Sequence, residues 1–312
     1  MPISTRIRSA LSAFLWLLCV ATPLRAQTVD DGIMLAKGEL LTGTTYTHDR
    51  WEEYWEGALK RTNGNIGEIT TEINVFTANY GLASRLNIIG MVPYVRTNAS
   101  QGVLHGITGF QDLTIAAKYS AADWTFGRGG TLEAIAVGVA GLPMTDYNPE
   151  LLPLSIGFGS KRASARGTLD YQTPVGLFAT GSAAYTWRSD VQLDRPYFFT
   201  DGEFVMSDRA DMPNVFDHMV SVGYLNRGLM SSVFLARQKT LGGGDIRRQD
   251  MPFVSNRMDF TRLGAMVMLP VPRLRTLTGE FAIARTMSGR NVGQATTITF
   301  GFQYVFNGEP VQ

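Results

Sequence analysis

Charge of either sign is scarce in this sequence, and neither sign prevails. Only 18% of the 312 residues are charged, and 28 Lys and Arg stand against 27 Asp and Glu, a formal net charge of +1. With 11% aromatic residues, this composition argues against a disordered chain, which has many charges and few aromatic residues. It also argues against nucleic acid as a partner, because binding to phosphates requires an excess of basic side chains.

Cysteine is limited to Cys19, which lies in an N-terminal stretch with the features of a secretory signal. Arg6 and Arg8 precede an apolar segment too short to cross a membrane, and a small residue stands at the expected cleavage position. The bulky residue before Cys19 disfavours lipidation of its thiol. We expect residues 1–26 to be removed as a signal peptide, which leaves residues 27–312 as one exported domain without disulfides.

Long apolar runs are also missing after this signal, so the sequence predicts no transmembrane helix there. Alternation takes their place, and the last segment shows it most clearly. Ile298, Phe300 and Phe302 occupy one face of an extended strand, while Thr297 and Thr299 occupy the other. A bulky face opposite a small polar face is typical of a membrane barrel, in which the bulky side chains contact lipid.

Segments of this kind recur along the chain and predict an all-β fold, a transmembrane up-and-down antiparallel β-barrel of about twelve strands. The expected strands cover 37–48, 66–80, 85–97, 109–120, 131–142, 161–173, 176–190, 216–227, 228–240, 258–270, 275–286 and 293–306. Alternation does not decide which way the side chains of 131–142 and 228–240 face.

The connections support the barrel. Those after odd-numbered strands are mostly long and those after even-numbered strands are mostly short, as in bacterial outer-membrane barrels. Aromatic residues gather at strand ends, where the girdles of such barrels lie. The all-β alternative is an exported β-sandwich, which does not usually keep this rhythm of long and short connections.

Three stretches carry more specific sequence. Residues 80–86 read Tyr-Gly-Leu-Ala-Ser-Arg-Leu and residues 92–95 read Val-Pro-Tyr-Val, while residues 109–113 read Gly-Phe-Gln-Asp-Leu and are followed by Lys118-Tyr119. With the aromatic last strand, they resemble the meta-pathway phenol-degradation family of outer-membrane proteins. The resemblance implies a barrel that takes up small, often aromatic compounds. One departure is that the chain continues past Phe306, whereas many such barrels end on an aromatic residue.

Catalysis is the main rival to transport as a class of function. Hydrolases of the barrel type place a His and a Ser two positions apart on one strand, so that the side chains share a face. None of His48, His105 and His218 has a Ser at that spacing. With no mature cysteine and three scattered histidines, the sequence predicts neither a metal nor a cofactor site. An outer-membrane hydrolase stays the second alternative.

Charged side chains on the small polar faces are expected inside the barrel, because a Lys or Arg that faces lipid at mid-depth costs about 2–4 kcal/mol. We predict that the following residues line the lumen: Glu68, Glu72, Asp112, Lys118, Arg166, Asp170, Arg188, Arg262 and Glu280. This near-balanced set suits either a polar channel or a lumen plugged by internal ion pairs.

The sequence thus predicts a non-enzymatic outer-membrane barrel with membrane lipids and a small-molecule solute as partners. Its expected function is that of a passive channel, and only the resemblance favours aromatic or hydrophobic solutes. The first alternative is a structural or surface-interaction barrel with a plugged lumen. A group of aromatic residues in the first long loop, Trp51, Tyr54 and Trp55, has two open interpretations, a substrate vestibule or an interfacial girdle. The sequence does not predict the oligomeric state.

Overall fold

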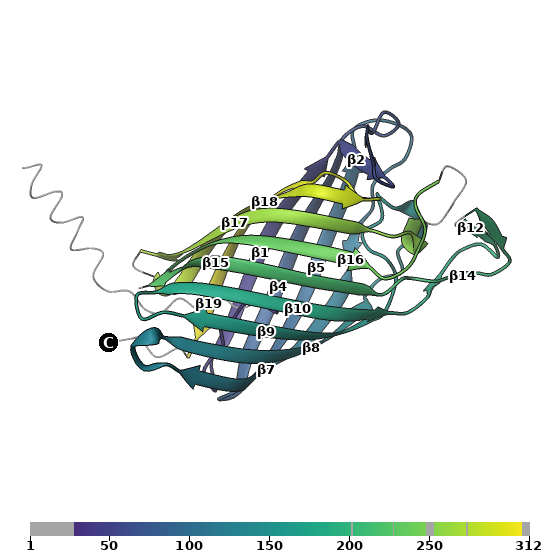
Figure 1. The fold of residues 1–312 in the computed structure, drawn as a ribbon. Helices are drawn as coiled ribbons and strands as arrows, with labels where there is room; N and C mark the ends of the chain where they lie inside the picture. Colours follow the sequence, from purple (N-terminus) through teal and green to yellow (C-terminus); the bar gives the residue numbers. More distant parts are fainter. Residues whose placement is uncertain (1–27, 201, 227, 248–252, 273, 308–312) are drawn as a thin grey trace, which may run out of the picture.

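The computed structural model describes residues 28–200, 202–226, 228–247, 253–272 and 274–307. These residues form a closed barrel of twelve antiparallel strands (Figure 1). The barrel strands are β1 (Leu40–Trp51), β4 (Ile69–Ala83), β5 (Leu86–Ala99), β7 (Asp112–Thr125), β8 (Thr131–Pro143), β9 (Arg162–Gln172), β10 (Leu177–Arg188), β15 (Val215–Asn226), β16 (Leu229–Thr240), β17 (Asp259–Val271), β18 (Leu274–Arg290) and β19 (Thr296–Phe306). The expected signal peptide, residues 1–26, lies outside the described residues.

Each barrel strand pairs with its neighbours in the sequence, and β19 pairs with β1 to close the sheet. Closure follows from the solvent, because hydrocarbon offers no partner to a free strand edge. The up-and-down order confirms the predicted fold, and all twelve expected strands are present. No helix in the described part of the chain is long and apolar enough to cross a membrane.

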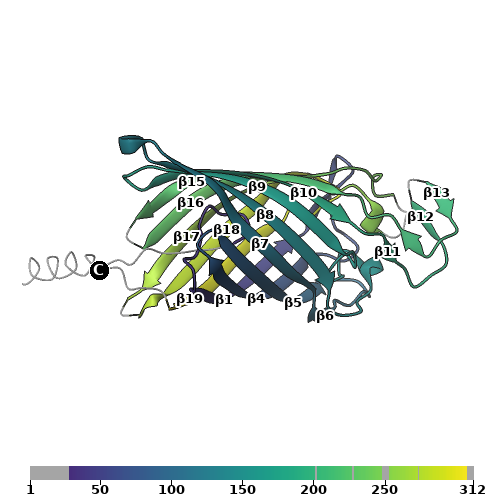
Figure 2. The ribbon, with the colours of Figure 1, turned by 90° about the horizontal axis from the view of Figure 1, so that it is seen from below.

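Long loops gather at one end of the barrel and short turns at the other. The loops contain short strands: β2 (Glu53–Glu56), β3 (Leu59–Thr62), β6 (Thr108–Phe110), β11 (Val191–Gln192), β12 (Phe198–Thr200), β13 (Glu203–Val205) and β14 (Arg209–Ala210). Figure 2 shows the tilt of the strands and the β12–β13 hairpin, which projects beyond the barrel. In barrels of this class the long loops face outward from the cell and the short turns face the periplasm.

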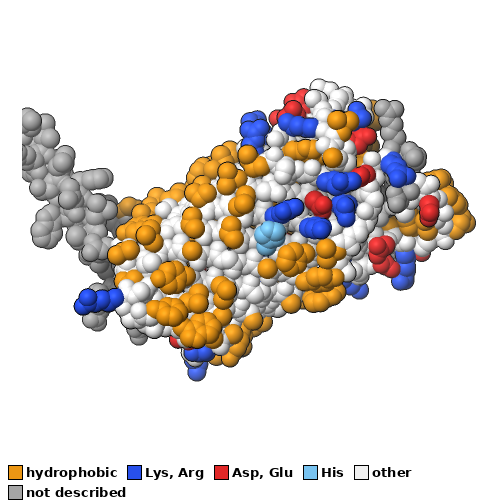
Figure 3. Space-filling view, viewed as in Figure 1, with side chains coloured by type: hydrophobic (Ala, Val, Ile, Leu, Met, Phe, Trp, Pro, Cys, Tyr) orange, Lys and Arg blue, Asp and Glu red, His pale blue; other side chains and the backbone are white. Residues whose placement is uncertain are grey.

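Side chains alternate between a lipid-facing outer wall and the interior. In β19, Phe300 and Phe302 are 50% and 56% exposed on the outside, while Gly301 and Gln303 are buried on the inside. Hydrophobic side chains accordingly cover much of the barrel wall in the space-filling view (Figure 3). This arrangement is the one that the alternation of the last strand predicts.

The facing of β8, which the sequence does not decide, is the reverse of that in β19. Ile135 and Val137 are buried on the inside, and Ala136 and Gly138 lie on the outer wall. Large apolar residues can face inward here only because something inside the barrel covers them.

Candidate functional site

The N-terminal segment, residues 28–39, lies inside the barrel. Its Leu35 is 1% exposed although it precedes the first strand. Val29 and Met34 pack against a hydrophobic cluster on the inward faces of β5, β7 and β8. The buried members of that cluster are Ile89, Ala116, Ile135 and Val137. The segment therefore fills one side of the lumen and explains the reversed facing of β8.

A buried lysine holds this segment. Lys118 of β7 is fully buried, and its Nζ donates to Asp31 Oδ1 at 2.6 Å and to the carbonyl oxygen of Thr28 at 3.0 Å. A buried ammonium is stable only when charged and polar partners replace its lost hydration. The segment supplies both partners. The buried Lys118 ammonium is therefore stabilised by the segment, and the ammonium in turn holds the segment inside the barrel.

Arg166 of β9 makes a second contact to the segment. Its Nη2 lies 3.1 Å from Asp30 Oδ1 and 2.7 Å from Asp217 Oδ1 of β15, and its Nη1 donates to Ser182 Oγ at 3.0 Å. This guanidinium therefore links the segment to β9 and to β15, which lies beyond β10 in the sheet. A cation between two carboxylates reduces the repulsion between them.

Two glycines allow the segment to approach the wall closely. A Cβ atom on Gly32 would lie 2.2 Å from Cγ of Asp170, and a Cβ atom on Gly81 of β4 would lie 2.0 Å from the carbonyl oxygen of Ala36. The backbone nitrogen of Gly38 donates to the carbonyl oxygen of Gly81 at 2.8 Å. Side chains at these glycines would push the segment away from the wall.

The other side of the lumen contains a cavity of about 180 Å³ near the short turns, which we call the inner cavity. Its apolar lining comprises Ile33, Phe178, Met219, Leu225, Met230, Phe234, Met266 and Met268. Acids and amides complete the lining, among them Asp170, Gln172, Glu280 and Gln303. Unbranched methionine side chains adapt to ligands of different shape, which makes this surface suitable for varied apolar molecules.

Two further cavities lie closer to the long loops. The middle cavity, of about 200 Å³, is lined by Arg166, Asp217 and Ala236 among others. The outer cavity, of about 190 Å³, is lined by Trp51 and Arg262 among others. Of the three loop aromatics, Trp51 lines the outer cavity, whereas Tyr54 and Trp55 are not among its lining residues.

The three cavities share lining residues. Phe260 lines both the outer and the middle cavity, and Asp30 and Met219 line both the middle and the inner cavity. The Arg262 guanidinium lies over the Phe260 ring, 5.1 Å from its centroid. The cavities therefore follow one another from the long loops to the short turns, with Phe260 and Asp30 at the two junctions.

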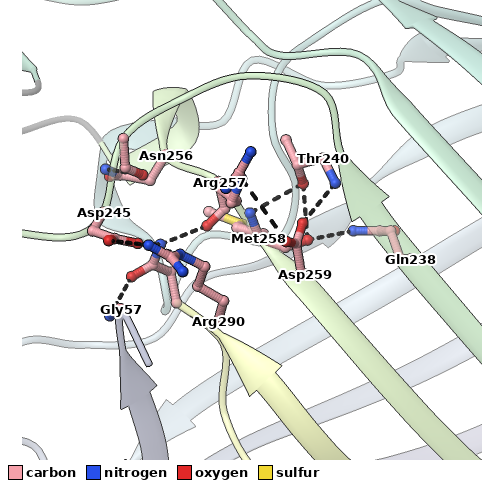
Figure 4. A network of polar contacts seen from close by, with 11 residues as sticks. Gly57, Gln238, Thr240, Asp245, Asn256, Arg257, Met258, Asp259 and Arg290 are labelled. Atoms are coloured by element: carbon pink, nitrogen blue, oxygen red, sulfur yellow. Dashed lines mark hydrogen bonds and ion pairs between the residues drawn. The ribbon is translucent and has the colours of Figure 1, made fainter. Parts of the chain in front are cut away.

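Polar contacts hold the β16–β17 loop in place at the long-loop end of the barrel, which we call the mouth (Figure 4). Asp245 accepts hydrogen bonds from Arg290 Nε at 2.7 Å and Nη2 at 2.5 Å, and from Asn291 Nδ2 at 3.0 Å. Asn291 Oδ1 accepts from the backbone nitrogen of Gly57 at 2.7 Å, which ties in the β2–β3 hairpin. The hydrogen bonds from Arg290 hold the pKa of Asp245 below its usual value.

A different contact closes the mouth above β7. The Tyr147 hydroxyl, from the β8–β9 loop, donates to Asp112 Oδ1 at 2.5 Å and accepts from the backbone nitrogen of Gly159 at 3.0 Å. Burial, and then the neighbouring Asp112 carboxylate, raise the pKa of Tyr147. This contact is buried, whereas Asp245 and Arg290 are partly exposed.

The structure places most of the predicted lumen residues on inward faces. Lys118, Arg166 and Asp170 contact or lie close to the N-terminal segment, Asp112 accepts the hydrogen bond from Tyr147 at the long-loop end, and Glu280 lines the inner cavity. Arg262 lines the outer cavity, and Arg188 lies over the Phe158 ring, 5.4 Å from its centroid.

Glu68 and Glu72 do not join them. Glu72 shares the outward face of β4 with Phe76 and accepts a hydrogen bond from the Tyr46 hydroxyl at 3.1 Å. Glu68 precedes β4 at the rim, where its carboxylate lies 3.8 Å from Arg50 Nη1. The alternation of β4 was assigned to the wrong faces, because Ile73 and Val75 face an interior that is apolar on this side.

Sequence reasoning missed the acids that the N-terminal segment contributes, Asp30 and Asp31, and the inward methionines. Nothing in the alternation of the strands indicates that a segment before β1 folds into the lumen. The spacing of the methionines could have indicated this surface, because Met266 and Met268 are two positions apart in β17 and therefore share a face.

A family profile described as "Putative MetA-pathway of phenol degradation" matches residues 62–224, more than half of the chain. The chain belongs to this family. The part that matches the phenol-degradation family extends from the end of β3 into β15 and includes Lys118, Arg166 and Asp217. The match confirms the resemblance that the sequence shows between residues 80 and 119.

Solved structures of outer-membrane proteins are similar to this chain to different degrees. An outer membrane channel from Pseudomonas putida F1 aligns with a TM-score of 0.72 and 14% identity over 89% of this chain and 100% of that chain. The translocator domain of the autotransporter NalP from Neisseria meningitidis aligns more loosely, with a TM-score of 0.45 and 11% identity over 87% of this chain and 90% of that chain. No protein with a curated description matches the sequence.

Proposed function

We propose that this member of the phenol-degradation family is a passive outer-membrane channel for small, largely apolar or aromatic molecules. The observation that carries the proposal is the row of three cavities, the inner and middle ones bordered by β15, β16 and β17 and the outer one by β17, β18 and β1. The apolar outer wall supports a place in the outer membrane, and the proposed signal peptide, residues 1–26, would direct export.

The size and lining of the inner cavity support this class of solute. Its volume of about 180 Å³ is close to that of an engineered apolar cavity of about 150 Å³ that binds benzene. Four methionines and two phenylalanines provide an adaptable apolar surface, and Glu280 and Gln303 offer hydrogen-bond acceptors to a phenolic hydroxyl. The family's association with phenol degradation points to the same solutes.

We propose no catalytic role. The described residues contain no group of three or more His, Cys, Asp and Glu side chains placed to hold a metal. His218 of β15 borders the middle cavity, but its exposed side chain lies on the outward face of the strand. Lys118 and Arg166 in the interior are engaged in ion pairs with Asp217 of the wall or with acids of the N-terminal segment.

A blocking substitution tests the channel. Ala236→Trp places an indole in the middle cavity, and it should lower single-channel conductance and slow the uptake of radiolabelled phenol several-fold. Ala183→Trp is the matched control, because Ala183 lies on the outer wall of β10, where an indole contacts lipid. Equal conductance and uptake in the two variants would contradict a route through the middle cavity.

The N-terminal segment supports a second candidate, a plugged barrel with a structural role. The observation that favours it is the pair of contacts that Lys118 and Arg166 make with Asp31 and Asp30. The same bilayer measurement separates the two candidates. A wild-type barrel that conducts no ions and does not speed phenol uptake would favour the plug.

A further inference from the structure

A group of basic side chains lies on the lipid-facing wall near the long loops. His218 of β15 and Arg237 and Lys239 of β16 are all exposed on outward faces. His218 is directly opposite Arg237 in the antiparallel register, and Phe216 is opposite Lys239. The three basic residues therefore form one surface, which we call the outer basic patch. In Figure 3 basic side chains gather beside a histidine on this wall.

The neighbours of the patch fix its depth in the membrane. Toward the short turns, the outward residues are apolar: Val220, Val233 and Leu235 are 54%, 51% and 44% exposed. Beside the patch stand Phe216 and Trp187, exposed aromatic residues of the kind that form the girdle at the membrane surface. The patch therefore lies where the apolar band ends, at the headgroup level of the outer leaflet.

The patch carries an excess of positive charge, although Asp259 of β17 lies beside Lys239 in the register. Among the described residues, no carboxylate forms an ion pair with Arg237 or Lys239. The acid closest in register, Asp259 of β17, already accepts from the backbone nitrogen of Thr240 at 2.7 Å and lies 3.8 Å from Arg257 Nε. Cations at the edge of hydrocarbon are costly unless an anion accompanies them.

We propose that the outer basic patch binds the phosphorylated headgroup of an anionic glycolipid in the outer leaflet. Arg237 and Lys239 are two residues apart on one face, about 7 Å along the strand, a span that one or two phosphates bridge. A guanidinium donates two parallel hydrogen bonds to a phosphate, and an ammonium contributes a point charge. The apolar side chains directly below, Val233 and Leu235, receive the acyl chains, which a free phosphate lacks. This surface is on the outer wall, so the proposal does not depend on transport through the lumen.

Native mass spectrometry of the full-length mature barrel in detergent tests the proposal, with diphosphoryl lipid A as the probe. The wild type should bind this lipid, and Arg237→Gln/Lys239→Gln should bind it about tenfold more weakly or worse, because two charge-assisted contacts are lost. Raising the salt concentration should weaken wild-type binding. The matched control is Arg85→Gln/Arg128→Gln, which removes two exposed cations at the short-turn end and should bind as the wild type does.

Additional measurements distinguish binding of a lipid from binding of free phosphate, and a loss of lipid binding from a loss of folding. Dephosphorylated lipid A should bind at least tenfold more weakly than the diphosphoryl form, and inorganic pyrophosphate should not compete at equal concentration. The charge-conserving variant Arg237→Lys/Lys239→Arg should keep binding, which shows that a loss in the glutamine variant is not a folding defect. Equal lipid binding by the glutamine variant and the wild type, or equal binding of the two forms of lipid A, would overturn the proposal. Competition by pyrophosphate would overturn the assignment to a lipid.

Discussion

The two sides of the barrel interior are built differently. On the packed wall, formed by the inward faces of β5, β7 and β8, branched apolar residues such as Ile89 and Val137 are buried by the N-terminal segment. On the open wall, formed by the inward faces of β15, β16 and β17, methionines such as Met219 and Met266 border cavities. The first wall is a core in the sense of a soluble protein, and the second is a surface that a small solute can contact.

This difference shows how a narrow barrel can hold a plug and still keep a path. The segment is fixed on the packed wall by Lys118 and reaches the open wall through Ile33, which packs against Met230 and Met268, and through the Asp30–Arg166–Asp217 contacts. Branched side chains suit the packed wall because they have few rotamers, and methionines suit the open wall because they have many.

The largest effect is expected from Lys118→Ala, which removes a fully buried ammonium and leaves the partly buried Asp31 carboxylate without its cation. Removing one partner of a buried pair costs about 3–5 kcal/mol, so the segment should leave the packed wall and single-channel conductance should rise several-fold. Arg128→Ala, which removes an exposed cation at the β7–β8 turn, is the control and should conduct nearly as the wild type does. A Lys118→Ala barrel with unchanged conductance would show that this pair does not hold the segment.

The next largest effect concerns the free energy of unfolding, which substitutions on the packed wall should lower more than substitutions on the open wall. Ile89→Ala removes a fully buried side chain from the packed wall and should cost about 2–4 kcal/mol of unfolding free energy. Met266→Ala should cost less than half as much, because its side chain already borders the inner cavity. Urea unfolding of the refolded barrels, followed by tryptophan fluorescence, measures both. Similar losses would mean that the open wall is packed as tightly as the other.

A smaller effect is expected on ion selectivity. Neutralising Arg166 and Arg262 together should shift selectivity several-fold toward cations, because two fixed positive charges leave the middle and outer cavities while Asp30 and Asp217 remain. Reversal potentials under a salt gradient measure the shift. Arg96→Gln/Arg285→Gln, on the outer wall, is the control and should not change the potential. If the arginine variant conducts with an unchanged potential, these residues do not line the ion path.

Sequence alone predicted the barrel well, because alternation and loop rhythm repeat over every strand and reflect the demand of the lipid for a closed sheet. It also placed Lys118 and Arg166 on inward faces, since a charge at mid-depth has no stable place in lipid. These inferences need only the local pattern within one strand.

Where sequence reasoning was wrong, the cause is a contact between distant parts of the chain. Glu72 was expected inside because a polar residue opposite an isoleucine usually faces water, but Ile73 packs next to a cluster formed with the β8–β9 loop. The facing of β8 depends on Val29 and Met34, which lie about a hundred residues earlier. No property of these strands by themselves indicates what fills the barrel beside them.

The smallest expected effect concerns pH at the two halves of the mouth. The pKa of Asp245, held low by Arg290, makes its contact stabilising above the ordinary carboxyl pKa, and that stabilisation is lost as pH falls through the depressed value. The pKa of Tyr147 is raised, so its contact is intact below the ordinary tyrosine pKa and weakens as pH rises through the alkaline range. Acid should therefore loosen the β16–β17 loop more than the β8–β9 loop, and alkali should loosen the β8–β9 loop alone, which hydrogen exchange of the two loops at pH 3, 7 and about 11 would show. Asp245→Asn should reproduce the acid effect at pH 7 and leave the Tyr147 side unchanged. Equal loosening of both loops in acid would mean that the two loops open as one cooperative unit. The difference between the packed and open walls would then be confined to the barrel strands and would not extend to the loops above them.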